Sequence, residues 1–322
     1  MKAFVYHEYG TPDVLKLEEI QKPSPKDDEI LVKVRAVSLN KADAYFLKGE
    51  PFMLRFEAGL QRPQRTILGA DISGIVEAVG KNVKQFKIGD EVFADLSSSG
   101  LGGLAEYVSA KENAFVHKPT TMSHEEAAAV PMAAVTALQS LKKGNIKAGQ
   151  KVLINGASGG VGTFALQIAK SFGTEVTAVC STKHLENARA LGADHVIDYT
   201  KENFTKNGKQ YDLILATNGY HSLADYKRTL TENGVYVCSG GTMKQIFASL
   251  LLGSVATMGS QKKITNLTAK PSQNDLMAVK NLIENKKVKS LIDKIYPFEQ
   301  TPDAFRHLVQ GHASGKIVIT VL

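Results

Sequence analysis

The sequence predicts an α/β fold in which a doubly wound parallel sheet is inserted into a mostly β domain. Three observations carry this prediction. Runs rich in β-branched residues fill the first third of the chain, strands and helices alternate from Lys151 onward, and a β-rich run closes the chain from Lys316. Such alternation is typical of a parallel sheet with right-handed crossovers. At 322 residues the chain is long enough for two domains.

The first segment, residues 1–119, is predicted to be irregular and mostly β. Four β-rich runs are separated by Gly, Pro, Asn and Asp, which favour turns. They are Phe4–Tyr6, Glu29–Val37, Asp71–Val79 and Glu91–Ala94. Ser123, followed by Glu126 and an Ala-rich run, predicts a helix start. We therefore place a domain boundary near Pro119 and assign residues 120–264 to the inserted domain.

The inserted domain consists of regular strand and helix units. Its expected strands are Lys151–Asn155, Glu175–Ser181, His195–Tyr199, Tyr211–Thr217 and Val235–Ser239, with helices after Val161, over Lys183–Leu191 and over His221–Leu230. The tail, residues 265–322, has expected helices over Asn274–Glu284 and Pro302–Val309 and extended runs over Leu291–Tyr296 and Lys316–Val321. We expect this tail to rejoin the first domain.

Charge, cysteine content and hydropathy exclude several classes of protein. The 39 Lys and Arg exceed the 32 Asp and Glu, but no run of five like charges occurs, so no nucleic-acid partner is expected. Cys180 and Cys238 are too few for a disulfide framework or a four-cysteine zinc lobe. The N-terminus lacks the apolar core of a signal peptide, so we expect a cytoplasmic protein. The longest apolar stretch, Ile246–Met258, is shorter than the ~20 residues that span a bilayer, so no transmembrane segment is expected and a buried or pocket-covering helix fits better.

A glycine-rich turn is the most informative motif. It lies between an apolar strand and an amphipathic helix and contains Gly156, Ser158, Gly159, Gly160, Val161 and Gly162. Gly156, Gly159 and Gly162 are spaced three residues apart. The first allows a tight turn, the second lets the backbone approach a pyrophosphate, and the third permits close packing of the helix on the strand. Amide groups at the helix start then bind the phosphates. The motif therefore predicts a Rossmann domain that binds a dinucleotide.

The end of the second strand favours NADPH over NADH. It carries no Asp or Glu to bind a free 2′-hydroxyl, whereas Ser181 and Lys183 suit a 2′-phosphate and Tyr199 is a candidate for its rim. The alternative is that Ser181 caps the next helix and Lys183 is merely solvated. Ligands gather at the carboxyl ends of parallel strands, which adds further cofactor candidates. They are Asn218, Gly240, Gly241 and Thr242.

The sequence predicts no metal site. None of the eight His residues lies near a Cys in metal-ligand spacing, and no His-x-x-x-His pair occurs. Alcohol oxidation requires loss of a hydroxyl proton, which a metal promotes by lowering the relevant pKa from about 16 toward 7. A metal-free enzyme is therefore better suited to reducing quinones or carbonyl-conjugated alkenes.

Four segments together resemble the zinc-free quinone oxidoreductase branch of the medium-chain dehydrogenase/reductase family over essentially the whole chain. They are Ser38–Asp43, Leu68–Gly74, the glycine-rich turn and His312–Val318. The resemblance implies a GroES-like catalytic domain interrupted by the Rossmann domain, and a homodimer. Zinc-containing relatives carry a Cys at the position of Asn40 and a His-Glu pair at the positions of Ala70 and Asp71, so the resemblance also implies that zinc ligands are lost.

The resemblance also implies roles for single residues. Asn40 and Tyr45 match positions that face the nicotinamide and the substrate, where an amide and a phenol donate to the oxygen that gains negative charge or to ribose hydroxyls. A turn position for Asn40 and core packing for Tyr45 are the alternatives. Asp43 is a catalytic-pocket candidate, better suited to orienting backbone or a basic partner than to general base catalysis. Thr136 and Lys316 are expected to contact the cofactor. The alternative for Thr136 is a buried threonine that only packs within its helix.

The expected function is NADPH-dependent hydride transfer to a small apolar quinone or α,β-unsaturated carbonyl. Phe52, Leu54 and Phe247 lie in apolar segments that are candidate walls of the substrate pocket, with core packing as the alternative. One competing interpretation is an enoyl-thioester reductase, which places a catalytic Tyr just after the position of Gly49, where this chain has Glu50. The other is a non-catalytic NADPH-binding protein.

Overall fold

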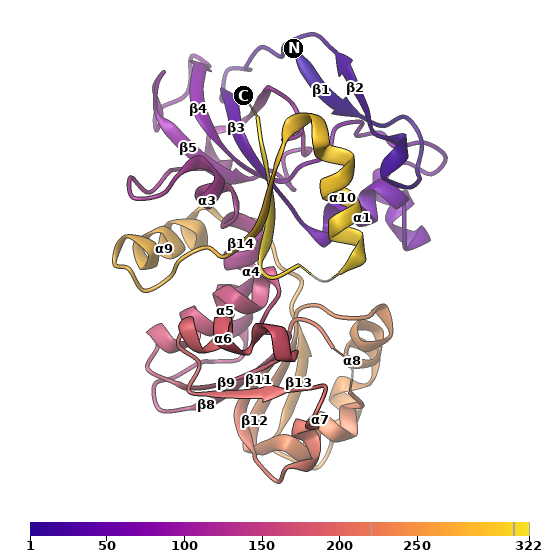
Figure 1. Cartoon of the computed structure of the whole chain (residues 1–322), viewed down its shortest axis with the longest axis vertical. Helices are drawn as coiled ribbons and strands as arrows, with labels where there is room; N and C mark the ends of the chain where they lie inside the picture. The colour runs from indigo at the N-terminus through magenta and orange to yellow at the C-terminus, as the bar shows by residue number, and fades with distance from the viewer. Residues whose placement is uncertain (220, 312, 322) are drawn as a thin grey trace. The chain divides into compact units, whose positions relative to one another are not determined.

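Two compact units make up the chain in the computed structural model, which describes residues 1–219, 221–311 and 313–321 (Figure 1). Unit 1 comprises Met1–Met132, Pro271–Lys280 and Ser290–Leu322, and unit 2 comprises Ala133–Lys270 and Asn281–Lys289. The first part of unit 1 ends at Met132, and unit 2 begins at Ala133. The domain boundaries expected from the sequence, between residues 119 and 120 and between residues 264 and 265, stay predictions.

Unit 2 contains a six-stranded sheet, among its described residues, in which neighbouring strands are parallel. The strands are β8 (Lys151–Asn155), β9 (Glu175–Cys180), β10 (His195–Asp198), β11 (Tyr211–Ala216), β12 (Leu230–Cys238) and β13 (Lys263–Asn266). Their order, β10-β9-β8-β11-β12-β13, is that of a dinucleotide-binding Rossmann sheet. The predicted fold is confirmed, with β13 as an edge strand that the sequence did not reveal.

Helices cover both faces of this sheet, with α5 and α6 on one side and α7 and α8 on the other (Figure 1). Their bounds are α5 (Gly160–Ser171), α6 (Leu185–Ala190), α7 (Leu223–Thr229) and α8 (Met243–Ala256), and α4 (Pro131–Lys143) leads into the unit. The apolar side chains of α5 are buried against the sheet, as their helical spacing predicts. In α8, by contrast, Leu250 and Leu251 are 64% and 71% exposed, so a buried helix is wrong there, and the alternative of a pocket-covering helix stays a prediction.

Unit 1 is built on a mostly antiparallel sheet in the order β14-β15-β3-β4-β5-β7, with β6 paired to β3. The strands are β3 (Glu29–Leu39), β4 (Asp71–Val79), β5 (Glu91–Asp95), β6 (Tyr107–Lys111), β7 (Phe115–His117), β14 (Ile292–Pro297) and β15 (Lys316–Thr320), with a separate ribbon of β1 (Lys2–Val5) and β2 (Lys16–Glu19). Because β15 pairs with β3, the C-terminal tail completes the sheet that the N-terminal segment begins. The expected insertion of one domain into another is therefore confirmed.

Short helices flank the sheet of unit 1, and Figure 1 shows α10 beside α1. Their bounds are α1 (Lys41–Lys48), α2 (Arg55–Ala58), α3 (His124–Ala128), α9 (Gln273–Glu284), whose last turn belongs to unit 2, and α10 (Thr301–Gln310). Helix α3 starts as predicted, because Ser123 and Glu126 each accept a hydrogen bond from the other's backbone. Over the described part of the chain, no helix has the length and apolarity needed to cross a membrane.

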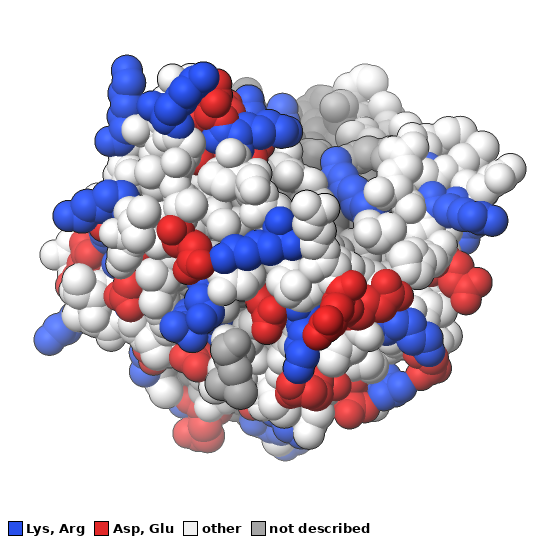
Figure 2. Space-filling view, turned by 90° about the horizontal axis from the view of Figure 1, so that it is seen from above, with Lys and Arg blue, Asp and Glu red and all other residues white. Residues whose placement is uncertain are grey.

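The charged surface is mixed in sign over the face that Figure 2 presents. Lys and Arg side chains alternate there with Asp and Glu, and no large area carries basic groups alone. Exposed ion pairs of the described residues include Lys22 with Glu77 at 2.7 Å and Lys81 with Asp27 at 2.9 Å. This is the pattern of an ordinary solvated surface.

Candidate active site

Three strands of unit 1 bring Asn40, Asp71 and Lys316 together. Asn40 directly follows β3, while Asp71 opens β4 and Lys316 opens β15. Strand β3 is antiparallel to both neighbours, with Ser38 opposite Asp71 and Leu39 opposite Ile317. The end of β3 therefore meets the beginnings of β4 and β15, although the residues are far apart in sequence.

The contacts among these three side chains form a buried ion-pair cluster. The Nζ of Lys316 lies 2.5 Å from Oδ1 of Asn40 and 3.2 Å from Oδ2 of Asp71. Asn40 Nδ2 donates to the same carboxylate oxygen at 3.0 Å, and the backbone N–H of Met132 donates to Oδ1 of Asp71 at 2.9 Å. The side chains of Lys316 and Asp71 are 3% and 0% exposed. Burial raises the pKa of Asp71, and the Lys316 ammonium opposes that rise.

Asp43 orients backbone, as expected. Its two carboxylate oxygens accept the backbone N–H of Asn40 at 2.8 Å and of Gly69 at 3.0 Å. Burial raises the pKa of this carboxyl to about 6, against the lowering effect of these two hydrogen bonds. Asn40 itself is the N-cap residue of α1, so its backbone position is fixed from both sides.

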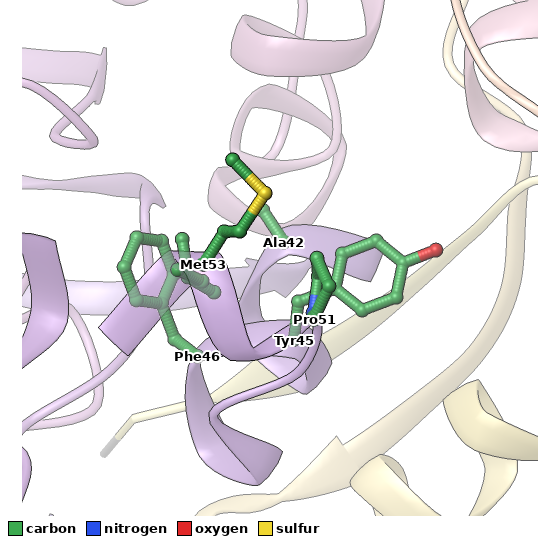
Figure 3. Close-up of a pocket in the computed structure, with 6 residues that line it drawn as sticks. Ala42, Tyr45, Phe46, Pro51 and Met53 are labelled. Atoms are coloured by element: carbon green, nitrogen blue, oxygen red, sulfur yellow. The ribbon is translucent and has the colours of Figure 1, made fainter. Parts of the chain in front are cut away.

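The aromatic side chain of Tyr45 lines an apolar pocket of about 310 Å³ on unit 1, together with Ala42, Phe46, Pro51, Met53 and Leu54. In Figure 3 the phenol oxygen of Tyr45 points away from the Phe46 ring. Tyr45 is 38% exposed, and Phe52, which is not among these lining residues, is 59% exposed. Core packing is therefore wrong for both residues, as it is for Phe247 of α8 at 41% exposure.

The positions that carry metal ligands in zinc-containing relatives do not fit a metal ion here. An ammonium lies against both Asn40 and Asp71, and its positive charge would repel a divalent cation at that place. Asn40 is also a weaker ligand than the thiolate it replaces. Within the described residues, no three His, Cys, Asp or Glu side chains are grouped so as to hold a metal.

The glycine-rich turn of unit 2 has the geometry that a pyrophosphate site needs. Gly156 has φ +90°, and an added Cβ would lie 2.7 Å from Thr217 Oγ1. At Gly162 a Cβ would lie 2.1 Å from the carbonyl oxygen of Gly156, so helix α5 packs on the turn without room for any side chain. At Gly159 the nearest protein atom would be 3.8 Å away. This space, next to N–H groups of the first turn of α5 that have no partner within the helix, fits the phosphates of a dinucleotide.

The adenosine end of the expected cofactor site lies where β9 and β10 end. Ser181 precedes a single 3-10 turn, Thr182–His184, but its hydroxyl accepts no capping hydrogen bond, so the alternative of a helix cap lacks support. The backbone N–H of Tyr199 donates to Cys180 O at 3.1 Å, which places the 61% exposed Tyr199 beside Ser181. Lys183 is exposed on the same turn.

Sequence reasoning missed two residues at this edge of the sheet. Asp198, at the end of β10, accepts hydrogen bonds from the hydroxyls of Thr182 and Thr200, so a carboxylate from the third strand supports the turn after the second. Thr217 donates to Asn155 O at 3.1 Å and to Gly156 O at 3.0 Å. Asp198 ends its strand and Thr217 follows its own, and each is adjacent in sequence to a predicted residue, Tyr199 or Asn218. Their position at the carboxyl ends of parallel strands is the signal that could have found them.

The remaining cofactor candidates have different surroundings. Asn218 is exposed beside the turn, and its backbone N–H donates to Asn155 O. Gly240 allows Thr217 O to approach, while Thr242 caps α8 by accepting from Gln245 N. Thr136 is 8% exposed within α4, which agrees with the alternative interpretation of a buried helix threonine. Contacts of these residues, and of Lys316, with a cofactor stay predictions.

Comparison with known proteins assigns the family. A model described as an alcohol dehydrogenase GroES-like domain matches residues 26–120, and one described as a zinc-binding dehydrogenase matches residues 191–319. A chloroplastic quinone-oxidoreductase homolog of Spinacia oleracea is 39% identical over 99% of this chain and 98% of its own length. The chain belongs to the quinone oxidoreductase branch of the medium-chain dehydrogenase/reductase family.

Other members of the family support the same assignment. An NADPH-dependent alkenal/one oxidoreductase of Arabidopsis thaliana is 37% identical over 99% of this chain and 79% of its own length. A quinone oxidoreductase structure from Coxiella burnetii matches with a TM-score of 0.89 and 30% identity, covering 100% of this chain and 99% of the other. The chain is thus an oxidoreductase that uses a nicotinamide cofactor. His312, which opens the last family-like segment, lies outside the described residues.

The expected cytoplasmic location is wrong on this comparison. The relatives from Spinacia oleracea and Arabidopsis thaliana are named chloroplastic, and a 33% identical NAD(P)H oxidoreductase from Danio rerio is named mitochondrial. The prediction relied on a missing signal for secretion, which says nothing about import into an organelle.

Proposed function

We propose that this chain is an NADPH-dependent, metal-independent reductase that transfers hydride to a small apolar quinone or α,β-unsaturated carbonyl. The observation that carries the substrate class is the pocket beside Tyr45, whose other lining residues are all apolar. The names of relatives agree, since they include an alkenal/one oxidoreductase and a 2-methylene-furan-3-one reductase.

Unit 2 supplies the cofactor site in this proposal. Backbone N–H groups at Gly160 and Val161 bind the pyrophosphate, and Ser181, Lys183 and Tyr199 surround the 2′-phosphate. Bound NADPH supplies the hydride. The hydroxyls of Thr182 and Thr200 both donate to the Asp198 carboxylate, which keeps its oxygens on protein donors beside this turn.

Unit 1 supplies the groups that stabilise the reacting oxygen. The Tyr45 phenol and one N–H of the Asn40 amide donate to the carbonyl or quinone oxygen as negative charge grows on it. Donors that are already oriented contribute most to such catalysis, because they need no reorganisation during the reaction. Asp43 assists by fixing the backbone of Asn40.

An absorbance assay of NADPH and NADH oxidation tests this function directly. Quinones, enones and crotonyl thioester are compared as acceptors, and NADPH with a quinone or enone is expected to react fastest. A faster reaction with crotonyl thioester would establish the enoyl-thioester reductase instead. Tight NADPH binding without turnover of any acceptor would establish a non-catalytic binding protein.

The cofactor preference has its own test in Lys183→Ala. Losing one charge-assisted contact to a phosphate is expected to weaken NADPH binding about tenfold and to leave NADH binding unchanged. Lys209→Ala, which removes another exposed lysine of unit 2, is the matched control. Equal losses for both cofactors would refute the phosphate role of Lys183.

We also propose that the chain forms a homodimer, as the resemblance to its family implies. The exposed Leu250, Leu251 and Val255 of α8 support an association, because contiguous apolar side chains on a surface favour a partner. Sedimentation velocity measures the assembly, and a monomer at all concentrations tested would contradict the proposal.

A further inference from the structure

Asn40 is held by its backbone and by both ends of its side-chain amide. Its backbone N–H donates to Asp43, its Nδ2 donates to Asp71 at 3.0 Å, and its Oδ1 accepts from the Lys316 ammonium at 2.5 Å. The groups come from three segments that the sheet register brings together. A predicted substrate-facing side chain is therefore part of a buried charged cluster.

The chemistry of the two charged neighbours permits one orientation of this amide. An ammonium has donors but no acceptor, and a carboxylate has acceptors but no donor. Turning the amide over would place its NH₂ group against Lys316 and its oxygen against Asp71, so that both contacts become repulsive. The N and O positions of Asn40 thus follow from its partners.

One N–H of the amide remains available in this orientation. Nδ2 carries two hydrogens, and one serves Asp71. Nδ2 also contacts Ser38 O, but this distance of 3.5 Å is beyond the range of a good hydrogen bond, so the second N–H is held only weakly. The ammonium on Oδ1 also polarises the amide, which strengthens the remaining N–H as a donor.

Stability does not explain why the fold buries Lys316. A buried ion pair contributes little net stability, because desolvation of the two charges offsets their attraction. Lys118 offers a contrast, since this other buried lysine of unit 1 pairs with Glu91 at 3.3 Å and caps the carbonyl of Met122. Lys316 instead contacts a side chain of the reaction site.

We propose that Lys316 and Asp71 are positioning residues that lock the Asn40 amide with its free N–H directed to the reacting oxygen. The inference rests on the proposed function, in which Asn40 donates to that oxygen. It gives Lys316 a role that differs from the cofactor contact expected by resemblance. A cofactor contact changes NADPH affinity, whereas amide locking changes the rate at saturating NADPH.

A double-mutant cycle with Asn40→Ala and Lys316→Met tests the coupling. Asn40→Ala is expected to lower kcat about a hundredfold, as loss of one preorganised donor does. Lys316→Met should lower kcat about tenfold or more, and the double variant should be no slower than Asn40→Ala alone. The NADPH dissociation constant, measured by fluorescence, should stay within about twofold of wild type throughout.

Two further variants distinguish a specific effect on kcat from a general loss of stability. Lys316→Gln keeps one donor for Asn40 Oδ1 without the charge, and an intermediate kcat is expected. Lys118→Met, the matched control, removes an equally buried lysine that does not touch Asn40, so kcat should be unchanged even where the melting temperature falls. If Lys118→Met lowers kcat as much as Lys316→Met, the effect is general destabilisation and the proposal is overturned.

Nuclear magnetic resonance of the ligand-free protein measures the mobility and the hydrogen exchange of the Asn40 side-chain amide directly. With ¹⁵N-labelled asparagine, the Asn40 side-chain signal is assigned by its absence in Asn40→Ala. Slow hydrogen exchange is expected in wild type, and faster exchange and a broader signal in Lys316→Met. Unchanged exchange would overturn the locking.

The outcomes separate this inference from the proposed function. Normal kcat in Asn40→Ala refutes the donor role of Asn40, whatever Lys316 does. A slow Asn40→Ala enzyme combined with additive losses, or with a weakened NADPH affinity in Lys316→Met, refutes the positioning role while the donor role stands.

Discussion

The glycine-rich turn of unit 2 and the Lys316 cluster of unit 1 are built on opposite principles. The turn uses consecutive residues, backbone donors and glycines whose Cβ atoms would collide with neighbouring backbone, as at Gly162. The cluster uses side chains from three separate segments, and its Lys316 lies 245 residues after Asp71, with which it forms a buried ion pair. The turn is thus set by steric fit, and the cluster by charge balance. Each responds to a different kind of change.

The largest effect is expected when the charge balance of the cluster is broken. Asp71→Leu leaves the Lys316 ammonium buried without its counter-ion and should cost about 3–5 kcal/mol of unfolding free energy. Adding Lys316→Met should restore most of that stability, because the double variant buries no unpaired charge at this place. Urea unfolding measures both. A double variant as unstable as Asp71→Leu would show that sterics, not charge, govern the cluster.

Steric fit in the turn is tested by the pair Gly162→Ala and Gly159→Ala. The first places a methyl group 2.1 Å from Gly156 O and should cost about 3 kcal/mol. The second meets only an atom at 3.8 Å, so its cost should stay below about 1 kcal/mol. Thermal unfolding gives both values.

Cofactor binding should separate the same two variants further. If Gly159 faces the pyrophosphate, Gly159→Ala weakens NADPH binding about tenfold or more in a stable protein. Unchanged affinity would show that the phosphates lie elsewhere.

A pH effect of intermediate size is expected from Asp95, which lies opposite Asp71 on β5. Burial, reinforced by the negative charge of Asp71, raises the pKa of Asp95 from 3.8 to about 6. The folded state therefore disfavours the ionised carboxyl, so its contribution to stability is lost as the pH rises from 3.8 through about 6. Asp95→Asn should be about 3 kcal/mol more stable than wild type at about pH 8, and equal to it at about pH 3.5.

Urea unfolding of Asp95→Asn and wild type across this pH range is the measurement. The amide keeps an acceptor for the Ser97 N–H, so the comparison isolates the charge. A constant difference between the two proteins at every pH would argue against a raised pKa.

The smallest effect is expected at the turn after β9. Thr182→Val removes the hydroxyl that holds Asp198, which frees a carboxylate oxygen near the expected 2′-phosphate. NADPH binding should weaken about threefold and NADH binding should not change. Thr231→Val, which breaks a comparable bond to Asp212 in the same unit, is the control. Equal effects of the two variants would place the 2′-phosphate elsewhere.

Local patterns carried most of the fold prediction. The strand Lys151–Asn155 and the start of α3 at Ser123 were predicted at their observed positions, because a short apolar run and a capping box act over a few residues. The edge strand β13 and the exposure of α8 were not, because both depend on which neighbours cover a segment.

The sequence by itself determined the cofactor turn, since its glycines, strand and helix are contiguous and their roles follow from backbone sterics. Only the tertiary structure revealed that Lys316 pairs with Asp71 and fixes Asn40, and that Asp198 supports Thr182. Contacts between distant segments depend on strand register, and a charge pattern along one chain does not specify which strands become neighbours. The chemistry of the substrate site belongs to this second kind of information.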